Sequence, residues 1–276
     1  MELGGAEIVA EPDSPLLRRT EDSGPRTESG RMESSVPDVN SMIRRAKSEG
    51  SPSSVPRPQS SHEPKWKRGA PPIPGPGLTV TLPTPSLLGD SIAELPTLEA
   101  LAAVVKKCRK CPLCEGRTHA VPGEGHPKAR LVLIGEGPGA VEDETGRPFV
   151  GPAGELLNGI LAAIEIPREA VYIANIVKCR PPQNRKPLPD EVAACLPYLH
   201  RQLALIQPKV IVALGGTAAE GLLGVKKSLG DLRGKVHRLD GIPLVVTYHP
   251  AALLRNPNWK KPTWDDVRIT RQLLDA

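Results

Sequence analysis

Four short apolar runs, each followed by a loop and a helical pattern, constrain the fold of this chain more than any other feature. The runs are residues 131–134, 171–175, 210–214 and 244–248. Continuous apolar runs are typical of strands that are buried on both faces of a parallel sheet. We therefore predict an α/β fold in which helices cover both faces of a central, four-stranded parallel sheet, giving three layers.

The first 95 residues differ in composition from the rest of the chain. They are rich in Pro and Ser, and they contain one aromatic residue, Trp66, and no Cys. Such a segment buries too little apolar area to offset the entropy lost on ordering. We predict that residues 1–95 form a disordered tail and linker and that residues 96–276 form the folded domain. Thr97 is expected to cap the first helix of that domain.

The charge of the chain favours a polyanionic partner. The formal net charge is +5 and the pI is about 9.0, and the tail is slightly acidic, so the positive charge falls on the folded part. This distribution favours binding to nucleic acid. The N-terminal residues lack the features of a secretory signal, and no apolar run approaches the roughly 18 residues of a membrane span. We expect a soluble cytoplasmic protein with no membrane partner.

The cysteine spacing predicts a metal site. An odd number of cysteines without a secretory signal indicates a reducing compartment and ligation in place of disulfides. Cys108 and Cys111 form a C-x-x-C pair, and Cys179 and Cys195 follow far along the chain. The spacing is compatible with zinc or with an iron–sulfur cluster. Two alternatives stay open: Cys114 can replace one of the four ligands, and Cys195 can be a buried apolar residue.

The loop that follows the first predicted strand, residues 135–154, is rich in glycine and in acidic side chains. Residues 135–140 fit the G-x-G-x-x-A pattern of dinucleotide sites. Pro138 and the carboxylates behind it oppose this interpretation, because a pyrophosphate would meet like charges. We favour another kind of pocket at the carboxyl ends of the strands, where the loop is expected to meet Asn175 and His249.

Three long motifs follow one another in the folded part: GEGPGAVEDETGRPFVGPAGELL, VYIANIVKCRPPQNRKPLPDE and YHPAALLRNP. Together with the cysteine spacing, they resemble the family 4 uracil-DNA glycosylases, the iron–sulfur branch of the uracil-DNA glycosylase superfamily. The resemblance implies a compact three-layer α/β fold with a four-stranded parallel sheet, stapled by a structural 4Fe–4S cluster. The cluster ligands that it implies are Cys108, Cys111, Cys179 and Cys195.

The resemblance also implies an activity, that of a monofunctional DNA glycosylase. Such an enzyme flips uracil out of DNA and hydrolyses its N-glycosidic bond. The abasic site that remains starts base excision repair of deaminated cytosine. The implied partner is uracil-containing DNA, single- or double-stranded. We expect a monomer associated with the nucleoid, in which the N-terminal tail contacts a replication or repair partner.

A pocket for a flipped uracil needs a stacking face, a reader of the base edge and a group that stabilises an anion. Phe149 provides a stacking face, and base–aromatic stacking contributes roughly 1–3 kcal/mol. Asn175 can accept a hydrogen bond from uracil N3–H and donate one to O4, whereas cytosine presents the reverse pattern. An imidazole N–H of His249 can stabilise the negative charge that develops on uracil O2.

Two carboxylates are expected to complete the pocket. Glu136, together with the backbone of Gly137, is the first candidate for positioning the attacking water. Glu142 resembles the family residue that stands near uracil C5 and obstructs the methyl group of thymine. The neighbouring Asp143 and Glu144 are expected to be solvated loop charges.

The segment after His249 is expected to contact DNA. Leu253 or Leu254 can enter the duplex and fill the space of the flipped base, although either leucine can instead belong to the core. Arg255, with Lys260 and Lys261, can hold phosphates.

Three rival interpretations remain. A superfamily relative that binds or covalently traps uracil-containing single-stranded DNA carries a nucleophilic histidine between its third and fourth cysteines, but no histidine lies between Cys179 and Cys195 here. A non-enzymatic iron–sulfur protein that binds DNA would not need Phe149, Asn175 and His249 together. A dinucleotide-binding enzyme is the third alternative.

Overall fold

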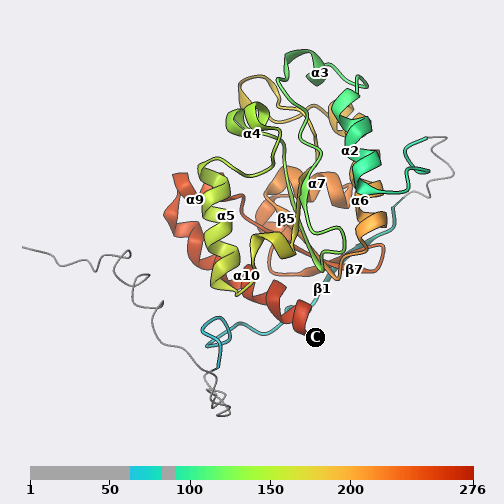
Figure 1. Ribbon diagram of the computed structural model, residues 1–276. Coiled ribbons are helices and arrows are strands. Elements are labelled where there is room, and N and C mark those ends of the chain that lie inside the picture. Colours follow the sequence, from blue (N-terminus) through green and yellow to red (C-terminus); the bar gives the residue numbers. More distant parts are fainter. Residues whose placement is uncertain (1–62, 83–90) are drawn as a thin grey trace, which may run out of the picture. The chain divides into compact units, whose positions relative to one another are not determined.

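The computed structural model describes residues 63–82 and 91–276, which belong to one compact unit, Ser61–Ala276 (Figure 1). Its strands are β1 (Pro76–Val80), β2 (Glu124–Gly125), β3 (Leu131–Gly135), β4 (Tyr172–Asn175), β5 (Val210–Leu214), β6 (Val236–Leu239) and β7 (Ile242–Thr247). Its helices are α2 (Leu98–Lys107), α3 (Leu113–Gly116), α4 (Ala140–Thr145), α5 (Pro152–Ala163), α6 (Pro189–Ile206), α7 (Gly216–Leu223), α8 (Leu229–Leu232), α9 (Pro250–Arg255) and α10 (Lys260–Asp275). Short 3-10 turns are η2 (Arg168–Ala170), η3 (Pro182–Asn184) and η4 (Pro257–Trp259). Among these helices, none has the length and apolar character needed to cross a membrane.

The strands of the described residues form one mixed, seven-stranded sheet in the order β1-β6-β7-β5-β3-β4-β2. The four predicted strands are its centre, since β7, β5, β3 and β4 are neighbours and pair in parallel. The prediction of a four-stranded sheet is therefore wrong in strand number. The three additional strands flank this centre: β2 has two residues, β6 carries His237 and Arg238, and β1 lies in the predicted tail, so none of them shows a continuous apolar run.

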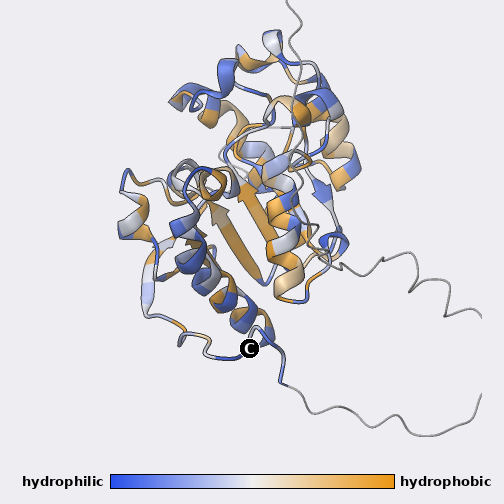
Figure 2. Cartoon of the chain, turned by 90° about the vertical axis from the view of Figure 1, so that its left-hand side faces the viewer, coloured by the Kyte–Doolittle hydropathy of each residue, from blue (hydrophilic) through white to orange (hydrophobic). Residues whose placement is uncertain are grey.

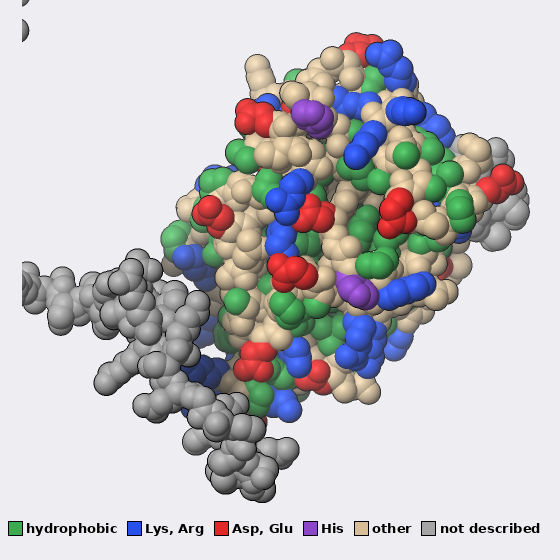
Figure 3. Space-filling view, in the orientation of Figure 1, with side chains coloured by type: hydrophobic (Ala, Val, Ile, Leu, Met, Phe, Trp, Pro, Cys, Tyr) green, Lys and Arg blue, Asp and Glu red, His purple; other side chains and the backbone are tan. Residues whose placement is uncertain are grey.

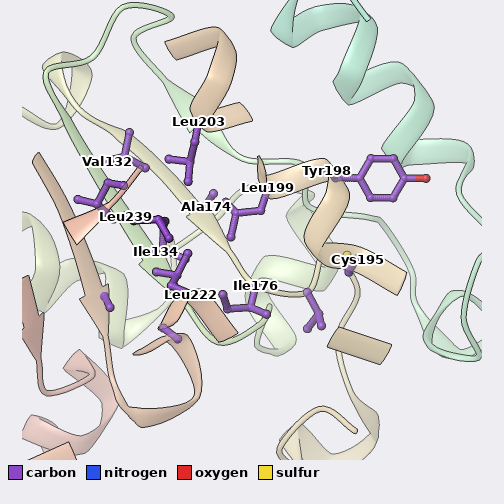
Figure 4. Close-up of a cluster of buried hydrophobic side chains, with 14 of the residues drawn as sticks. Val132, Ile134, Ala174, Ile176, Cys195, Tyr198, Leu199, Leu203, Leu222 and Leu239 are labelled. Atoms are coloured by element: carbon purple, nitrogen blue, oxygen red, sulfur yellow. The ribbon is translucent and has the colours of Figure 1, made fainter. Parts of the chain in front are cut away.

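Helices cover both faces of the sheet, as predicted. Successive side chains of a strand point to opposite faces. Val132 and Ile134 of β3 belong to a cluster with α2, α6 and α7, which Figure 4 shows in close-up. Leu131 and Leu133 belong to a second cluster, with α5 and α10. Figure 2 shows the central strands as hydrophobic elements between helices whose exposed sides are hydrophilic.

Part of the predicted tail is folded. Trp66 is 1% exposed and packs with the second core cluster, and the guanidinium of Arg271 lies 5.3 Å from its ring centroid. Strand β1 pairs in parallel with β6. Disorder is therefore the wrong prediction for residues 63–82, because one large aromatic side chain and one strand pairing supply burial that the average composition does not reveal. The rest of the predicted tail that is not described, residues 1–62 and 83–90, lies outside the structure.

The predicted N-cap is confirmed. The Oγ1 of Thr97 accepts the backbone N–H of Ala100 at 3.1 Å, and helix α2 begins at the next residue. The acidic loop after β3 contains a helix, α4, that the sequence analysis did not predict. Gly146 ends α4 in the left-handed conformation, with φ 71°, and turns the chain toward Phe149.

Candidate active site and cysteine site

A pocket of about 340 Å³ lies where the central parallel strands end. Its volume is in the range of small-ligand sites. Its lining comes from the loop after β3, the end of β4, the segment before α6 and the start of α9. The prediction that these loops gather at one edge of the sheet is thus confirmed. The lining residues are Glu136, Gly137, Pro138, Gly139, Glu142, Phe149, Ala153, Asn175, Pro181, Asn184, Arg185, His249, Ala251 and Arg255.

Asn175 and Phe149 approach each other over a glycine. Gly135 is the last residue of β3 and pairs with Asn175 of β4. A Cβ on Gly135 would lie 2.5 Å from Asn175 Oδ1 and 2.6 Å from Phe149 Cζ. Contacts that short do not occur, so a side chain at position 135 would displace the amide or the ring. The glycine-rich pattern therefore makes room for two side chains, in place of a pyrophosphate.

The side chain of Asn175 has an unsatisfied acceptor. Asn175 is 1% exposed, and its Oδ1 has no hydrogen-bond partner in the described part of the chain. A buried polar atom without a partner costs roughly 1–3 kcal/mol, so an orphaned acceptor at a pocket is suited to a ligand donor. The geometry provides a fixed acceptor for one N–H of a bound planar molecule.

The backbone around Phe149 is strained and firmly held. Phe149 has φ 51°, in the left-handed region that non-glycine residues seldom adopt. Glu142 Oε1 accepts the N–H groups of Val150 and Gly151, each at 2.9 Å. From the other side, Arg168 donates to the carbonyl of Phe149 at 3.1 Å. These contacts fix the ring as one wall of the pocket, so Glu142 orders the loop as well as lining the pocket.

His249 lies next to the ring of Phe149, with 5.4 Å between the ring centroids. Its Nδ1 accepts the backbone N–H of Ala251 at 3.2 Å, so the neutral ring carries its proton on Nε2. Burial, together with the nearby Arg255, lowers the pKa of His249 to about 4. The imidazole is therefore a neutral N–H donor at ordinary pH.

Asp143 and Glu144, the two carboxylates that were expected to be solvated, differ in their environment. Asp143 is 3% exposed and its carboxylate accepts the N–H of Thr118 at 3.0 and 3.1 Å. The prediction that Asp143 is a solvated loop charge is wrong, because its side chain ties helix α4 to the segment after α3. Glu144 is exposed, as predicted, and Glu136 is half-buried at the pocket.

Helix α9 separates the two leucines that were considered for DNA insertion. Leu253 is 1% exposed and belongs to the core, so the prediction that Leu253 can enter a duplex is wrong. Leu254 is 50% exposed. Arg255 is also exposed, and it lines the pocket. The helical turn thus leaves one of the two leucines free to contact a partner.

An aromatic stack beside α9 was not found from the sequence. The rings of Tyr248 and Trp259 are stacked, with centroids 4.7 Å apart and an interplanar angle of 8°. The guanidinium of Arg233 lies 4.5 Å from the centroid of Tyr248. Trp259 is 37% exposed and precedes Lys260 and Lys261. The sequence feature that could have indicated this stack is a tryptophan next to two lysines.

The segment before α6 adds pocket residues that the sequence analysis also missed. Asn184 and Arg185 line the pocket, and Arg185 forms an ion pair with Glu191 at 2.6 Å. The run of prolines around them gave no sign of a pocket role, because the turn η3 decides where their side chains point.

All five cysteines line one small cavity between α2, α3 and α6. Three of the sulfurs accept N–H groups: Cys179 Sγ from Arg117 Nη1 at 3.0 Å, Cys195 Sγ from Lys178 N at 3.2 Å and Cys108 Sγ from Lys110 N at 3.5 Å. N–H···S contacts of this kind are common around thiolate ligands. Burial raises the pKa of the Cys195 thiol to about 12, so a cationic centre is needed to ionise it.

Within residues 63–82 and 91–276, no group of three His, Cys, Asp or Glu side chains is already placed to hold one metal ion. The donor set at this cavity is nevertheless made of cysteine sulfurs, which suit zinc or an iron–sulfur cluster.

Comparison with known proteins agrees with the geometry of the pocket. Residues 122–269 match the Uracil DNA glycosylase superfamily. The chain belongs to this superfamily. Among its relatives is the Type-4 uracil-DNA glycosylase of Pyrobaculum aerophilum, 48% identical over 168 residues, which are 58% of this chain and 86% of that protein.

Other relatives in the superfamily support assignment to family 4. The Type-4 uracil-DNA glycosylase of Thermotoga maritima is 51% identical over 161 residues, 58% of this chain and 84% of that protein. That of Sulfurisphaera tokodaii is 45% identical over 186 residues, 64% of this chain and 84% of that protein. The predicted membership of family 4 is confirmed.

Proposed function

We propose that this protein is a monofunctional uracil-DNA glycosylase that starts base excision repair. The buried Asn175 carries the proposal, because its unpaired Oδ1 meets a stacking ring and an imidazole N–H donor in one pocket. The similarity to three proteins named Type-4 uracil-DNA glycosylase supports it. In duplex DNA the target base must leave the stack to reach such a pocket.

Each pocket residue has a task in this reaction. The flipped uracil stacks on Phe149, and the amide of Asn175 accepts from N3–H and donates to O4. As the bond between C1′ and N1 breaks, its electron pair moves into the base, and the Nε2–H of His249 stabilises the negative charge on O2. Glu136, with the Gly137 backbone, orients the water that attacks C1′ and accepts its proton. Glu142 stands where the methyl group of thymine would clash.

The test is strand cleavage at a single uracil. An oligonucleotide with one uracil, beside matched cytosine and thymine controls, is incubated with the protein and then treated with alkali. Cleavage at uracil alone supports the proposal. A heat-stable protein–DNA adduct without turnover would indicate the self-trapping relative. Intact DNA in every sample would indicate a protein that binds DNA without excising uracil.

We propose that the cysteine site holds a structural 4Fe–4S cluster on Cys108, Cys111, Cys179 and Cys195. The cluster would join α2 to α6 and supply no step of the hydrolysis. We expect broad visible absorption and about four iron and four sulfide per chain. Cys195→Ala should lose the absorption and lower the Tm. A matched Cys114→Ala protein should retain both, and zinc in place of iron would contradict the proposal.

We propose that DNA runs along α9 and η4. Leu254 would replace the flipped base in the stack, Arg255, Lys260 and Lys261 would hold phosphates, and the exposed face of Trp259 would stack on a neighbouring base. Basic and acidic side chains are interspersed on the face seen in Figure 3. Because no single basic patch covers that face, we assign the contacts to this segment, which has no acidic residue between Pro250 and Thr263.

Leu254→Ala should lower uracil excision from duplex DNA roughly tenfold and leave excision from single strands unchanged. The reason is that a side chain that fills the vacated stack matters only where a stack exists. Single-turnover rates on both substrates measure the effect. Leu188→Ala is the matched control, since Leu188 is 53% exposed and lies outside the pocket. An equal loss on both substrates would refute the insertion role.

The pocket is complete within one chain, and we propose that the enzyme acts on nucleoid DNA as a monomer. Binding of a replication or repair partner by the N-terminal tail, residues 1–95, stays a prediction.

A further inference from the structure

Lys178 is a buried cation that the proposed reaction does not use. Its side chain is 1% exposed. Its Nζ donates to the backbone carbonyl of Asn175 at 2.8 Å and to Gln202 Oε1 at 2.7 Å, and both acceptors are neutral. Burying an ammonium group is unfavourable unless its donors are satisfied.

The carbonyl of Asn175 needs a donor that the sheet does not offer. The N–H of Ile176 donates to Gly135 of β3 at 2.9 Å, so the Asn175 carbonyl points to the opposite side, toward β2. Strand β2 pairs with β4 in antiparallel register, with Glu124 opposite Ile173. Continuing this register places Pro122 opposite Asn175, and proline has no N–H to donate. Lys178 Nζ supplies the missing donor.

The same residue reaches the cysteine site. The backbone N–H of Lys178 donates to Cys195 Sγ at 3.2 Å, and its next neighbour is Cys179. Gln202 lies on α6, the helix that carries Cys195, and its Nε2 donates to the carbonyl of Pro122 at 2.7 Å and to the hydroxyl of Tyr172 at 3.0 Å. The hydrogen bonds of this buried network therefore join β4, the segment just before β2 and α6.

We propose that Lys178 is a positioning residue that fixes the uracil-reading end of β4 to the cysteine site. The inference rests on the proposed function, since it assigns Asn175 as the reader of the base. With Gly135 on one side and Lys178 on the other, the backbone of Asn175 is held in place from both directions. The side-chain amide then points at the pocket without rearrangement, and displacements near 1 Å at such a group cost about 10²-fold in rate.

The test replaces Lys178 with Met, which is apolar and of similar length. We expect Lys178→Met to lower the single-turnover excision rate 10- to 100-fold. Affinity for DNA without uracil should not change, because Lys178 is buried away from any phosphate. Preference in binding for a strand with non-hydrolysable 2′-fluoro-deoxyuridine over the matching thymidine strand should fall. Visible absorption per chain reports whether the cysteine site is intact.

Two further variants keep the test decisive. Leu199→Ala removes a fully buried apolar side chain from α6 that takes no part in the hydrogen bonds of the network, so it should lower the Tm and leave the excision rate unchanged below the Tm. Gln202→Leu removes one acceptor of Lys178 Nζ, and it decides the matter if Lys178→Met does not fold or loses its absorption. The inference would be overturned if either Lys178→Met or Gln202→Leu excised uracil at the wild-type rate and kept the wild-type preference for uracil. It would also be overturned if their losses were no larger than the loss in Leu199→Ala. If the wild-type protein itself fails to excise uracil, the proposed function fails instead.

Discussion

Asn175→Leu is expected to lose roughly 10⁴-fold in kcat/KM on uracil-containing DNA. The side chain keeps its approximate shape but can no longer accept from N3–H or donate to O4. Both polar groups of the base would then be buried without partners, and sites built on hydrogen bonds discriminate strongly for this reason. Single-turnover cleavage of a strand with one uracil measures the loss.

The matched control for this variant is Gln207→Leu. Gln207 ends α6, is exposed and lies outside the pocket, so the excision rate of this variant should equal that of the wild type. Circular dichroism and visible absorption confirm that both proteins are folded. An Asn175→Leu protein that retains more than about a tenth of the wild-type rate would remove Asn175 as the reader of the base.

His249→Ala should lower kcat about 10²- to 10³-fold, the usual cost of removing one donor to a developing anion. The pH dependence identifies the active form of the ring. Because burial lowers the pKa of His249 to about 4, the wild-type rate should show no inflection near pH 6.5 that is due to this ring. A loss that begins only as pH approaches 4 is expected, since protonation of Nδ1 removes the acceptor of the Ala251 N–H.

The same pKa predicts an effect on stability. The unfolded chain binds a proton at His249 near pH 6.5, whereas the folded chain resists it down to about pH 4. The free energy of unfolding contains the full contribution of the neutral ring above pH 6.5. It decreases by about 3 kcal/mol in total as the pH falls toward 4. Urea unfolding of wild type and His249→Gln between pH 7 and 4 measures the difference. Parallel pH curves for the two proteins would contradict the buried, neutral state.

Topology alone was enough to predict which of these residues lie together in the pocket. The apolar runs indicated parallel strands, and the carboxyl ends of parallel strands meet at one edge, so Asn175, His249 and the loop with Phe149 were expected together. Sequence spacing left the choice between Leu253 and Leu254 open, because both lie on one turn of helix and only packing of α9 against neighbouring elements such as α5 selects the buried one. Asp143 was misjudged because its partner, the Thr118 N–H, comes from a distant segment.

By itself, the sequence determined the central parallel strands, the helices on both faces, the family and the pocket residues Phe149, Asn175 and His249, because each of these depends on local pattern or on ordered motifs. The tertiary structure decided what depends on contacts between distant segments. It added β1 and Trp66 to the fold, brought five cysteines to one cavity and buried Lys178 against the carbonyl of Asn175. No local pattern reveals such contacts, since the partner of a buried polar group is known only once the chain has closed around it.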